Sequence, residues 1–139
     1  DTIIDAGADI ITIHQESTTR LYSCIEKIKS RGVKAGVVLS PATNEDTLKY
    51  VLDKIDMILL MTINPGEAGP GFHEELLTKI KNVRELIGDR DIDLEVDGGI
   101  DNTNIAKCKE AGVNVFVSGG YVFKGDIAEK IKTLREALK

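Results

Sequence analysis

Asp97 is the residue best placed for chemistry, because it ends an alternating segment and precedes two glycines. Leu94 and Val96 alternate with acidic residues, which is the period of a β-strand. The pair 98–99 then lets the backbone turn sharply or approach a ligand closely. In parallel α/β folds, functional groups gather at the carboxyl ends of the strands. Asp97 is therefore a candidate functional carboxylate, and a carboxylate that only caps the following turn is the structural alternative.

Glycine-rich loops follow three of the predicted strands, at residues 64–72, 98–99 and 119–120. Glycines expose main-chain N–H groups, so loops of this kind on one rim could form an anion-binding nest. In barrels, the loops after the last two strands commonly bind phosphate. The structural alternative is that these glycines only make tight turns. The loops match neither the Walker nor the GxGxxG pattern, which argues against a nucleotide site.

Two further residues end predicted strands at the same rim. His14 could join Glu16 and Asp97 in a metal site, but these three residues have no diagnostic spacing. A histidine satisfied by hydrogen bonds is therefore the favoured interpretation of His14. Met61 is most simply a packing residue, and the functional alternative is a soft wall for a substrate.

The elements that position these residues follow from hydrophobic periodicity. Apolar segments predict buried strands at 10–13, 35–39, 57–62, 94–97 and 115–118, and most are near-continuous, which is typical of parallel sheets. Apolar residues three and four apart predict helices between and after the strands. These are Leu21, Ile25 and Ile28; Leu48, Val51 and Leu52; Leu76, Leu77, Ile80, Val83 and Ile87; Ile105 and Cys108; and Ile127, Ile131, Leu134 and Leu138.

This alternation predicts one α/β domain, residues 1–139, built on a parallel sheet. Gly7, Gly32 and Gly112 mark the points where a helix ends in a left-handed turn and a strand begins. A complete eightfold barrel needs about 250 residues, so five strands indicate a partial barrel or an open sheet. Periodicity leaves both open. The first residues read as the end of a helix, and we therefore expect a fragment.

Composition narrows the class of protein. The chain has 42% hydrophobic and 29% charged residues, which is ordinary for a globular domain. The formal charge of −5 argues against nucleic acid or an anionic membrane as a partner. The sequence shows neither a membrane-spanning apolar run nor a signal-peptide pattern at its start. Cys24 and Cys108 fall in predicted helices without CxxC spacing. We expect a cytoplasmic protein.

Taken together, the segments 11–16, 35–41, 60–66, 94–100 and 117–119 resemble the ribulose-phosphate 3-epimerase family in order and spacing. The most specific pair is Met-Thr-Ile-Asn-Pro-Gly with Glu-Val-Asp-Gly-Gly. The resemblance covers essentially the whole chain. It implies a partial (β/α)8 TIM barrel of the ribulose-phosphate-binding type, in which the five strands are the fourth to the eighth and the first three βα units are missing.

The resemblance also implies a reaction, the reversible inversion at C3 that links ribulose 5-phosphate and xylulose 5-phosphate. Such an inversion needs two acid/base groups on opposite faces of the carbon and one divalent metal ion, with zinc, iron, manganese or cobalt as candidates. Asp97 matches the carboxylate that serves as both acid/base group and metal ligand. Its partners belong to strands absent from this sequence, so we expect the 139 residues alone to be inactive and the full-length enzyme to be a homo-oligomer.

The resemblance assigns the remaining site residues to substrate binding. Those of the covering loop are Gly66, Glu67, Ala68 and Gly69, and those of the phosphate grip are Gly98, Gly99, Gly119 and Gly120. His14 matches a position outside the family's ligand set, and its expected place, like that of Met61, is the wall of the substrate pocket.

The chain departs from the family pattern at four positions. Glu67 replaces an aromatic residue, Ala68 a glycine, Pro70 a glutamine and Gly120 a common serine. A hexulose-phosphate (allulose 6-phosphate) 3-epimerase and a non-catalytic phosphate-binding module therefore remain as alternatives.

Overall fold

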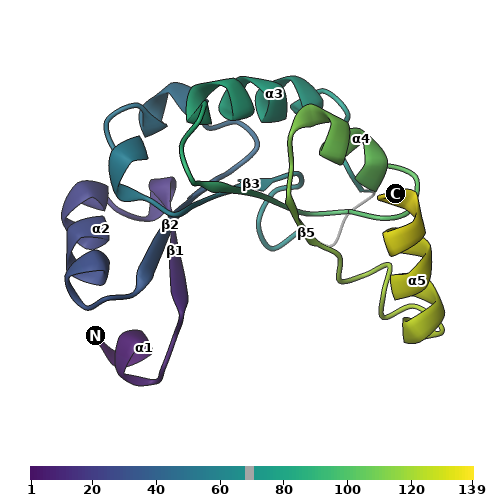
Figure 1. Cartoon of the computed structure of the whole chain (residues 1–139), viewed down its shortest axis with the longest axis horizontal. Coiled ribbons are helices and arrows are strands. Elements are labelled where there is room, and N and C mark those ends of the chain that lie inside the picture. Colours follow the sequence, from purple (N-terminus) through teal and green to yellow (C-terminus); the bar gives the residue numbers. More distant parts are fainter. Residues whose placement is uncertain (68–70) are drawn as a thin grey trace.

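Five parallel strands form one curved sheet, with the helices along its outer side (Figure 1). This computed structural model describes residues 1–67 and 71–139. The strands pair in chain order and are β1 (Ile10–His14), β2 (Lys34–Leu39), β3 (Met57–Met61), β4 (Asp93–Asp97) and β5 (Val115–Val117). The predicted parallel α/β architecture is therefore confirmed.

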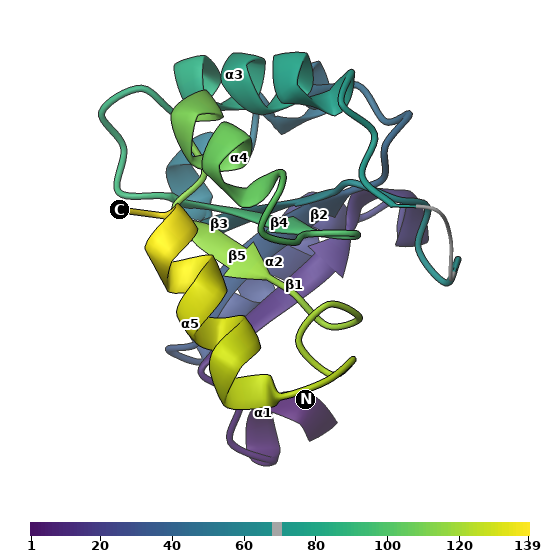
Figure 2. The same cartoon turned by 90° about the vertical axis from the view of Figure 1, so that its right-hand side faces the viewer.

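The helices cover one face of the sheet only. They are α1 (Thr2–Asp5), α2 (Leu21–Ser30), α3 (Leu76–Ile87), α4 (Ile105–Ala111) and α5 (Ile127–Ala137), with 3-10 turns η1 (Gln15–Ser17), η2 (Glu45–Leu48) and η3 (Leu52–Lys54). Figures 1 and 2 show the resulting arch, with its concave side open. In the described part of the chain, no helix combines the length and the apolarity that crossing a membrane requires.

The helix predicted around residues 48–52 is wrong in type. The chain there makes the two separate turns η2 and η3. At their ends, Val51 N–H donates to Leu48 O (2.9 Å) and Lys54 N–H donates to Val51 O (2.9 Å). These bonds span three residues instead of four, which is the 3-10 pattern. Leu48 and Val51 are nevertheless buried, because a spacing of three residues suits both helix types.

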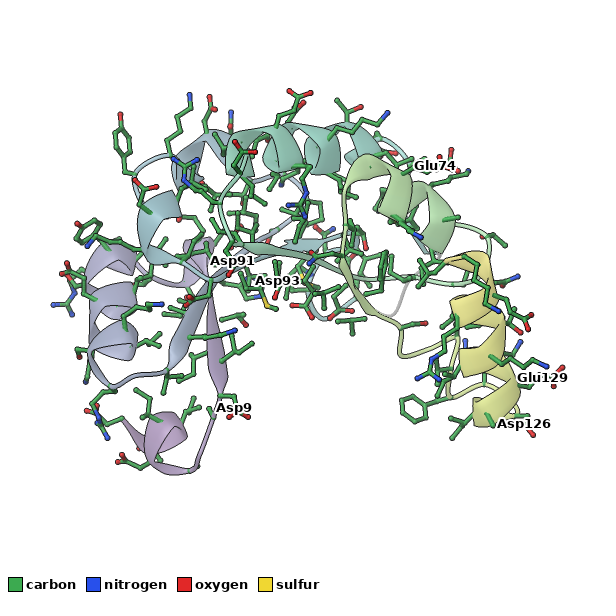
Figure 3. The ribbon with its side chains drawn as sticks, in the orientation of Figure 1. Asp9, Glu74, Asp91, Asp93, Asp126 and Glu129 are labelled. Carbon is green, nitrogen blue, oxygen red and sulfur yellow. The ribbon has the colours of Figure 1, made fainter. Side chains whose placement is uncertain are left out.

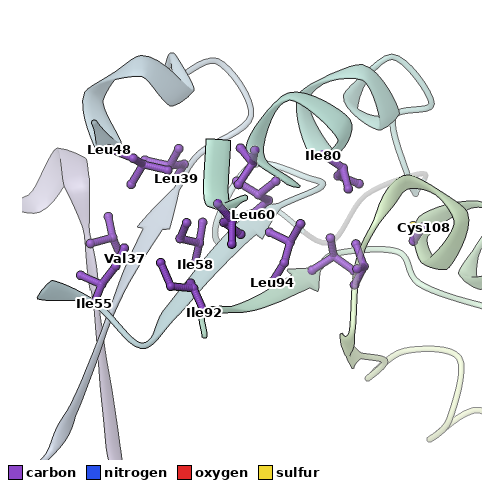
Figure 4. Close-up of a cluster of buried hydrophobic side chains, with 14 of the residues drawn as sticks. Val37, Leu39, Leu48, Ile55, Ile58, Leu60, Ile80, Ile92, Leu94 and Cys108 are labelled. Atoms are coloured by element: carbon purple, nitrogen blue, oxygen red, sulfur yellow. The ribbon is translucent and has the colours of Figure 1, made fainter. Parts of the chain in front are cut away.

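The hydrophobic core lies between the sheet and the helices (Figure 4). Register places Val37, Ile58 and Leu94 side by side on neighbouring strands, and all three are fully buried. Ile80 of α3 closes the layer from the helix side. Because side chains alternate along a strand, the residues between these core positions face the concave side.

The concave face carries the polar residues of β4. The burial pattern of Asp93–Asp97 alternates, with Leu94 and Val96 buried and the acidic residues half-buried. The predicted alternation in this strand is therefore confirmed. Gly7, Gly32 and Gly112 have positive φ angles of 93°, 74° and 115°, as the sequence predicts.

Candidate functional site

Asp97 ends β4 on the concave face of the sheet. Its register partners are Met61 on β3 and Val117 on β5, so two apolar side chains flank the carboxylate on the same face. Burial raises the pKa of Asp97 above its ordinary value. The N–H of Thr62 donates to the main-chain oxygen of Asp97 (2.8 Å). The strand end that carries Asp97 is therefore held from β3, while the carboxyl group itself favours protonation more than a free aspartate does.

A cleft of about 730 Å³ opens beside Asp97, at the carboxyl ends of β4 and β5. Six of the residues predicted for the site line it: Glu67, Asp97, Gly98, Gly99, Gly119 and Gly120. The structure thus brings the candidate carboxylate and two of the predicted glycine pairs to one cavity. Parallel strands make this possible, because their carboxyl ends share one rim.

Atoms of neighbouring segments pack closely against the turn 98–99. A Cβ atom on Gly98 would lie 2.6 Å from Cγ1 of Ile63, and one on Gly99 would lie 2.6 Å from the main-chain nitrogen of Phe72. Both glycines also have positive φ angles, 128° and 65°. Only glycine fits this backbone without strain, so the geometry of the turn requires glycine at both positions.

The loop after β5 is looser. A Cβ atom on Gly119 or Gly120 would meet nothing within 4 Å. The N–H of Phe123 donates to the main-chain oxygen of Gly119 (3.0 Å), which closes one turn of backbone at the cleft. These two glycines leave open space in the cleft rather than relieving a steric clash.

The covering loop is only partly described. Gly66 has a positive φ of 83° and precedes Glu67, whose exposed carboxylate accepts a hydrogen bond from Nδ2 of Asn64 (3.2 Å). Glu67 lines the cleft, whereas Gly66 is not among its lining residues. The predicted site residues Ala68 and Gly69, together with Pro70, lie outside the described residues.

The grouping of His14, Glu16 and Asp97 as a metal trio is wrong. β1 and β4 are separated by two strands, so three interstrand spacings place these strands about 14 Å apart. Nδ1 of His14 instead lies 3.3 Å from Oε2 of Glu16, which supports the favoured interpretation of a hydrogen-bonded histidine. Neither His14 nor Met61 lines the cleft, and their proposed role as a pocket wall stays a prediction.

Acidic residues are numerous but dispersed. Figure 3 labels carboxylates on separate parts of the arch, among them Asp9 before β1, Glu74 before α3 and Asp126 before α5. Among residues 1–67 and 71–139, no three His, Cys, Asp or Glu side chains come together as a metal site. Asp97 is therefore not part of a complete metal site within the described part of the chain.

Sequence reasoning missed two residues that line the cleft, Tyr121 and Lys124, and the structural role of Glu16. Tyr121 and Lys124 line the cleft, and the ammonium of Lys130 lies 4.4 Å from the ring centroid of Tyr121. The position of Tyr121 and Lys124 just after the predicted 119–120 loop was the available signal.

Glu16 is a structural anchor. Burial raises its pKa, but hydrogen bonds from Thr43 and from the main chain outweigh burial and bring the pKa to about 2.

The family model of the ribulose-phosphate 3 epimerase family matches residues 1–123. The chain belongs to the ribulose-phosphate 3-epimerase family. It is 43% identical over 136 residues to ribulose-phosphate 3-epimerase of Escherichia coli K12, covering 96% of this chain and 60% of the relative. It is 48% identical over 120 residues to the Serratia marcescens enzyme, covering 85% and 57%.

A plant member of the epimerase family, the chloroplastic ribulose-5-phosphate-3-epimerase of Arabidopsis thaliana, is 43% identical over 137 residues, covering 95% of this chain and 49% of the relative. The chain thus spans about half to three fifths of the length of these relatives. Because one relative is chloroplastic, family membership does not fix the compartment, and the cytoplasmic location stays a prediction.

Solved structures agree on the fold. A crystal structure of 3-hexulose-6-phosphate synthase superposes with a TM-score of 0.76 at 25% identity, covering all of this chain and 66% of that one. The 3-keto-L-gulonate-6-phosphate decarboxylase of Vibrio cholerae gives a TM-score of 0.75 at 20% identity, covering 97% and 63%. Such enzymes are TIM barrels, so the five strands of this epimerase-family chain form part of that fold.

Proposed function

We propose that the chain carries one acid/base carboxylate and the phosphate cleft of a ribulose-phosphate 3-epimerase. The observation that carries this proposal is that Asp97 and the glycine pairs 98–99 and 119–120 line the same cleft. Membership of the epimerase family and the names of the relatives support the same reaction. The proposed substrate pair is ribulose 5-phosphate and xylulose 5-phosphate.

The environment of Asp97 suits proton transfer at a carbon next to a carbonyl. A general base works best when its pKa approaches the working pH, and burial raises the pKa of Asp97 in that direction. The apolar neighbours Met61 and Val117 supply part of this burial from the flanking strands. Asp97 would then remove the C3 proton from one face of the sugar and return a proton to that face in the reverse direction.

The phosphate group would bind where the cleft offers main-chain N–H donors. Gly98, Gly99, Gly119 and Gly120 bring the backbone to the cavity surface, and N–H groups neutralise a dianion without side chains. The cleft also contains the carboxylates of Glu67, Asp97 and Asp101 against one cation, Lys124, among its lining residues. Lys124 therefore joins the proposed phosphate site as its balancing charge.

Of the metal ligands that the family resemblance implies, this chain contains Asp97. A catalytic divalent ion takes three or more protein ligands, and no three His, Cys, Asp or Glu side chains among the described residues come together to supply them. These residues do not form a metal site by themselves. The family resemblance implies further metal ligands on strands that this sequence does not contain.

Inversion at C3 needs a second acid/base group on the opposite face of the carbon. The other cleft carboxylates are poor candidates. Oδ1 of Asp101 accepts hydrogen bonds from the main chain (2.8 Å) and the hydroxyl (2.6 Å) of Thr103, and Glu67 is exposed. We expect the 139 residues alone to leave ribulose 5-phosphate unchanged, and measurable epimerisation by the purified chain would contradict this.

The decisive assay uses the chain fused behind the first three βα units of the Escherichia coli relative. Exchange of the C3 proton of ribulose 5-phosphate with deuterated water is followed by NMR. Asp97→Asn should slow this exchange by about 10²–10⁴-fold, because a positioned general base contributes that much. Asp91→Asn is the matched control, since Asp91 is exposed just before β4. Near-normal exchange in Asp97→Asn would refute the proposed role.

Folding of the Asp97→Asn variant provides a second control. Because burial raises the pKa of Asp97, the ionised form destabilises the folded chain once the pH exceeds that raised value. The amide should therefore melt at the same temperature as the native residue or above it at neutral pH. Loss of exchange without loss of thermal stability separates a catalytic effect from unfolding.

The six-carbon alternative is distinguished by kinetics of the same fusion. Position 68, which motivates that alternative, lies outside the described residues. Comparing kcat/KM on ribulose 5-phosphate and allulose 6-phosphate decides between them. A strong preference for the pentulose would remove the hexulose-phosphate option.

A further inference from the structure

We propose that Thr62, Asn104 and Ser118 are positioning residues that turn the main-chain N–H groups of Gly99 and Ile100 toward an anion. This inference rests on the proposed phosphate cleft and deepens it. Rather than the glycines alone, three side chains that lie next to the ends of β3, α4 and β5 would determine which way the peptide groups of the turn face.

Three consecutive carbonyl groups in the turn after β4 each accept one side-chain hydrogen bond. The hydroxyl of Thr62, just after β3, donates to Gly98 O. Nδ2 of Asn104, the N-cap residue just before α4, donates to Gly99 O (2.8 Å), and the hydroxyl of Ser118, just after β5, donates to Ile100 O (2.7 Å). A neighbour from outside the turn thus fixes each of these carbonyl groups.

Peptide geometry converts these bonds into a direction for the N–H groups. A trans peptide is planar, so its C=O and N–H point in opposite directions. The Gly98 carbonyl faces Thr62, which is fully buried, and the N–H of Gly99 therefore faces away from the protein interior. By the same argument, the N–H of Ile100 faces away from the buried Asn104.

No acceptor for these two N–H groups is found among the described residues. Within residues 1–67 and 71–139, neither Gly99 N–H nor Ile100 N–H donates to a protein acceptor. Both residues line the cleft. Successive main-chain N–H groups at a turn are a recurrent feature of anion sites. The next N–H along the chain, that of Asp101, is already used, since it donates to Oδ1 of Asn104 (3.0 Å).

The hydrogen bonds from Thr62, Asn104 and Ser118 are needed because glycines leave the orientation of the peptide groups undetermined. A Gly-Gly pair can rotate the peptide between its two residues at little cost, and rotation would present a carbonyl oxygen to the bound phosphate. The Thr62 hydroxyl disfavours that orientation. The N–H of Thr62 also donates to the main-chain oxygen of Asp97 (2.8 Å), so one residue fixes both the carboxylate-bearing strand end and the first anion donor.

The test is titration of the 139-residue chain, labelled with ¹⁵N, with inorganic phosphate. In the native chain, the largest amide shifts should fall on Gly99 and Ile100. Thr62→Val keeps the shape but lacks the hydroxyl that fixes the Gly98 carbonyl. Phosphate should bind about tenfold more weakly, because the N–H of Gly99, which donates to the anion, is no longer held in place. Thr62→Ser should restore native binding. Thr133→Val is the matched control, since the Thr133 hydroxyl donates to Glu129 O on the exposed face of α5 (3.0 Å).

Native phosphate affinity in a folded Thr62→Val variant would overturn the proposal, as would phosphate shifts that fall away from residues 98–100. If Thr62→Val does not fold, Ser118→Ala is used instead, because Ser118 is only half-buried. It should bind phosphate about threefold more weakly, and native affinity there would also be contradictory. Proton exchange by the fusion is measured separately. A hydroxyl-dependent phosphate site without exchange would refute the epimerase proposal and leave this one standing.

Discussion

Nζ of Lys79 on α3 donates a 2.8 Å hydrogen bond to the main-chain oxygen of Ser40, just beyond the end of β2. The same ammonium donates to Pro41 O (3.1 Å) and Thr43 O (2.6 Å), so one buried lysine binds three carbonyl groups of a single loop. The N–H of Ser40 in turn donates to Glu16 (2.8 Å). A helix on the outer layer therefore fixes the rim loop after β2 and, through it, the carboxylate after β1.

Replacing Lys79 with Met should destabilise the chain. The aliphatic stem is kept, but three carbonyl groups lose their charged donor, and we expect the free energy of unfolding to fall by about 2–3 kcal/mol. Urea unfolding at neutral pH measures the change. Lys81→Met, at an exposed position on the same helix, is the control and should stay within about 0.5 kcal/mol of the native chain. Equal losses of stability in Lys79→Met and Lys81→Met would argue against a stabilising role of the three hydrogen bonds from Lys79.

Glu16 should make stability depend on pH in the acid range. Burial raises its pKa, but the hydrogen bonds from Thr43 and the main chain lower it from 4.5 to about 2. A depressed pKa in the folded state means that the ionised form stabilises the fold above pH 4.5 and that this contribution disappears as the pH falls toward 2. Between about pH 5 and about pH 3, the native chain should therefore lose more stability than Glu16→Gln. Urea unfolding at the two pH values measures both losses, and equal losses of unfolding free energy in the native chain and in Glu16→Gln would contradict this.

The two glycine loops of the cleft should respond differently to alanine. Gly98→Ala places a Cβ atom 2.6 Å from Cγ1 of Ile63 at a φ of 128°, and we expect it to cost about 1–3 kcal/mol and to weaken phosphate binding. Gly120→Ala meets nothing within 4 Å and should be neutral within about 0.5 kcal/mol. Thermal melts and phosphate titrations of both variants test the contrast. Native stability and native phosphate binding in Gly98→Ala would show that the turn accepts a side chain at this position.

Lys124 should provide much of the side-chain attraction for phosphate. It is the only cation among the described residues that line the cleft, which also contains the carboxyl groups of Glu67, Asp97 and Asp101. Lys124→Gln should weaken phosphate binding about three- to tenfold at low ionic strength, with a smaller difference in high salt because exposed charges are screened. Lys132→Gln, on the exposed surface of α5, is the control. Calorimetry at two salt concentrations measures the effect.

The strands and the core of the site could be predicted because their signals are local. Alternation around Leu94 and Val96 and the glycine pair after Asp97 are consequences of backbone geometry within a few residues. The same holds for the left-handed Gly112 after α4. Such signals do not depend on where the rest of the chain lies.

Contacts between distant segments could not be predicted in this way. Lys79 occurs in an amphipathic helix where a lysine normally faces solvent, and its three carbonyl partners lie 36 to 39 residues earlier. Thr62 is an unremarkable strand-end residue until the fold brings Gly98, 36 residues later, against its hydroxyl. The turns η2 and η3 were mistaken for a helix because Leu48 and Val51 satisfy both periodicities.

The side-by-side placement of Met61, Asp97 and Val117 has an evolutionary consequence. Bulkier apolar neighbours would exclude more water from the carboxyl group and raise its proton affinity further, whereas a polar neighbour would admit water and lower it. Substitutions on β3 and β5 could therefore shift the pH range in which such an enzyme works while leaving every group that touches the sugar unchanged.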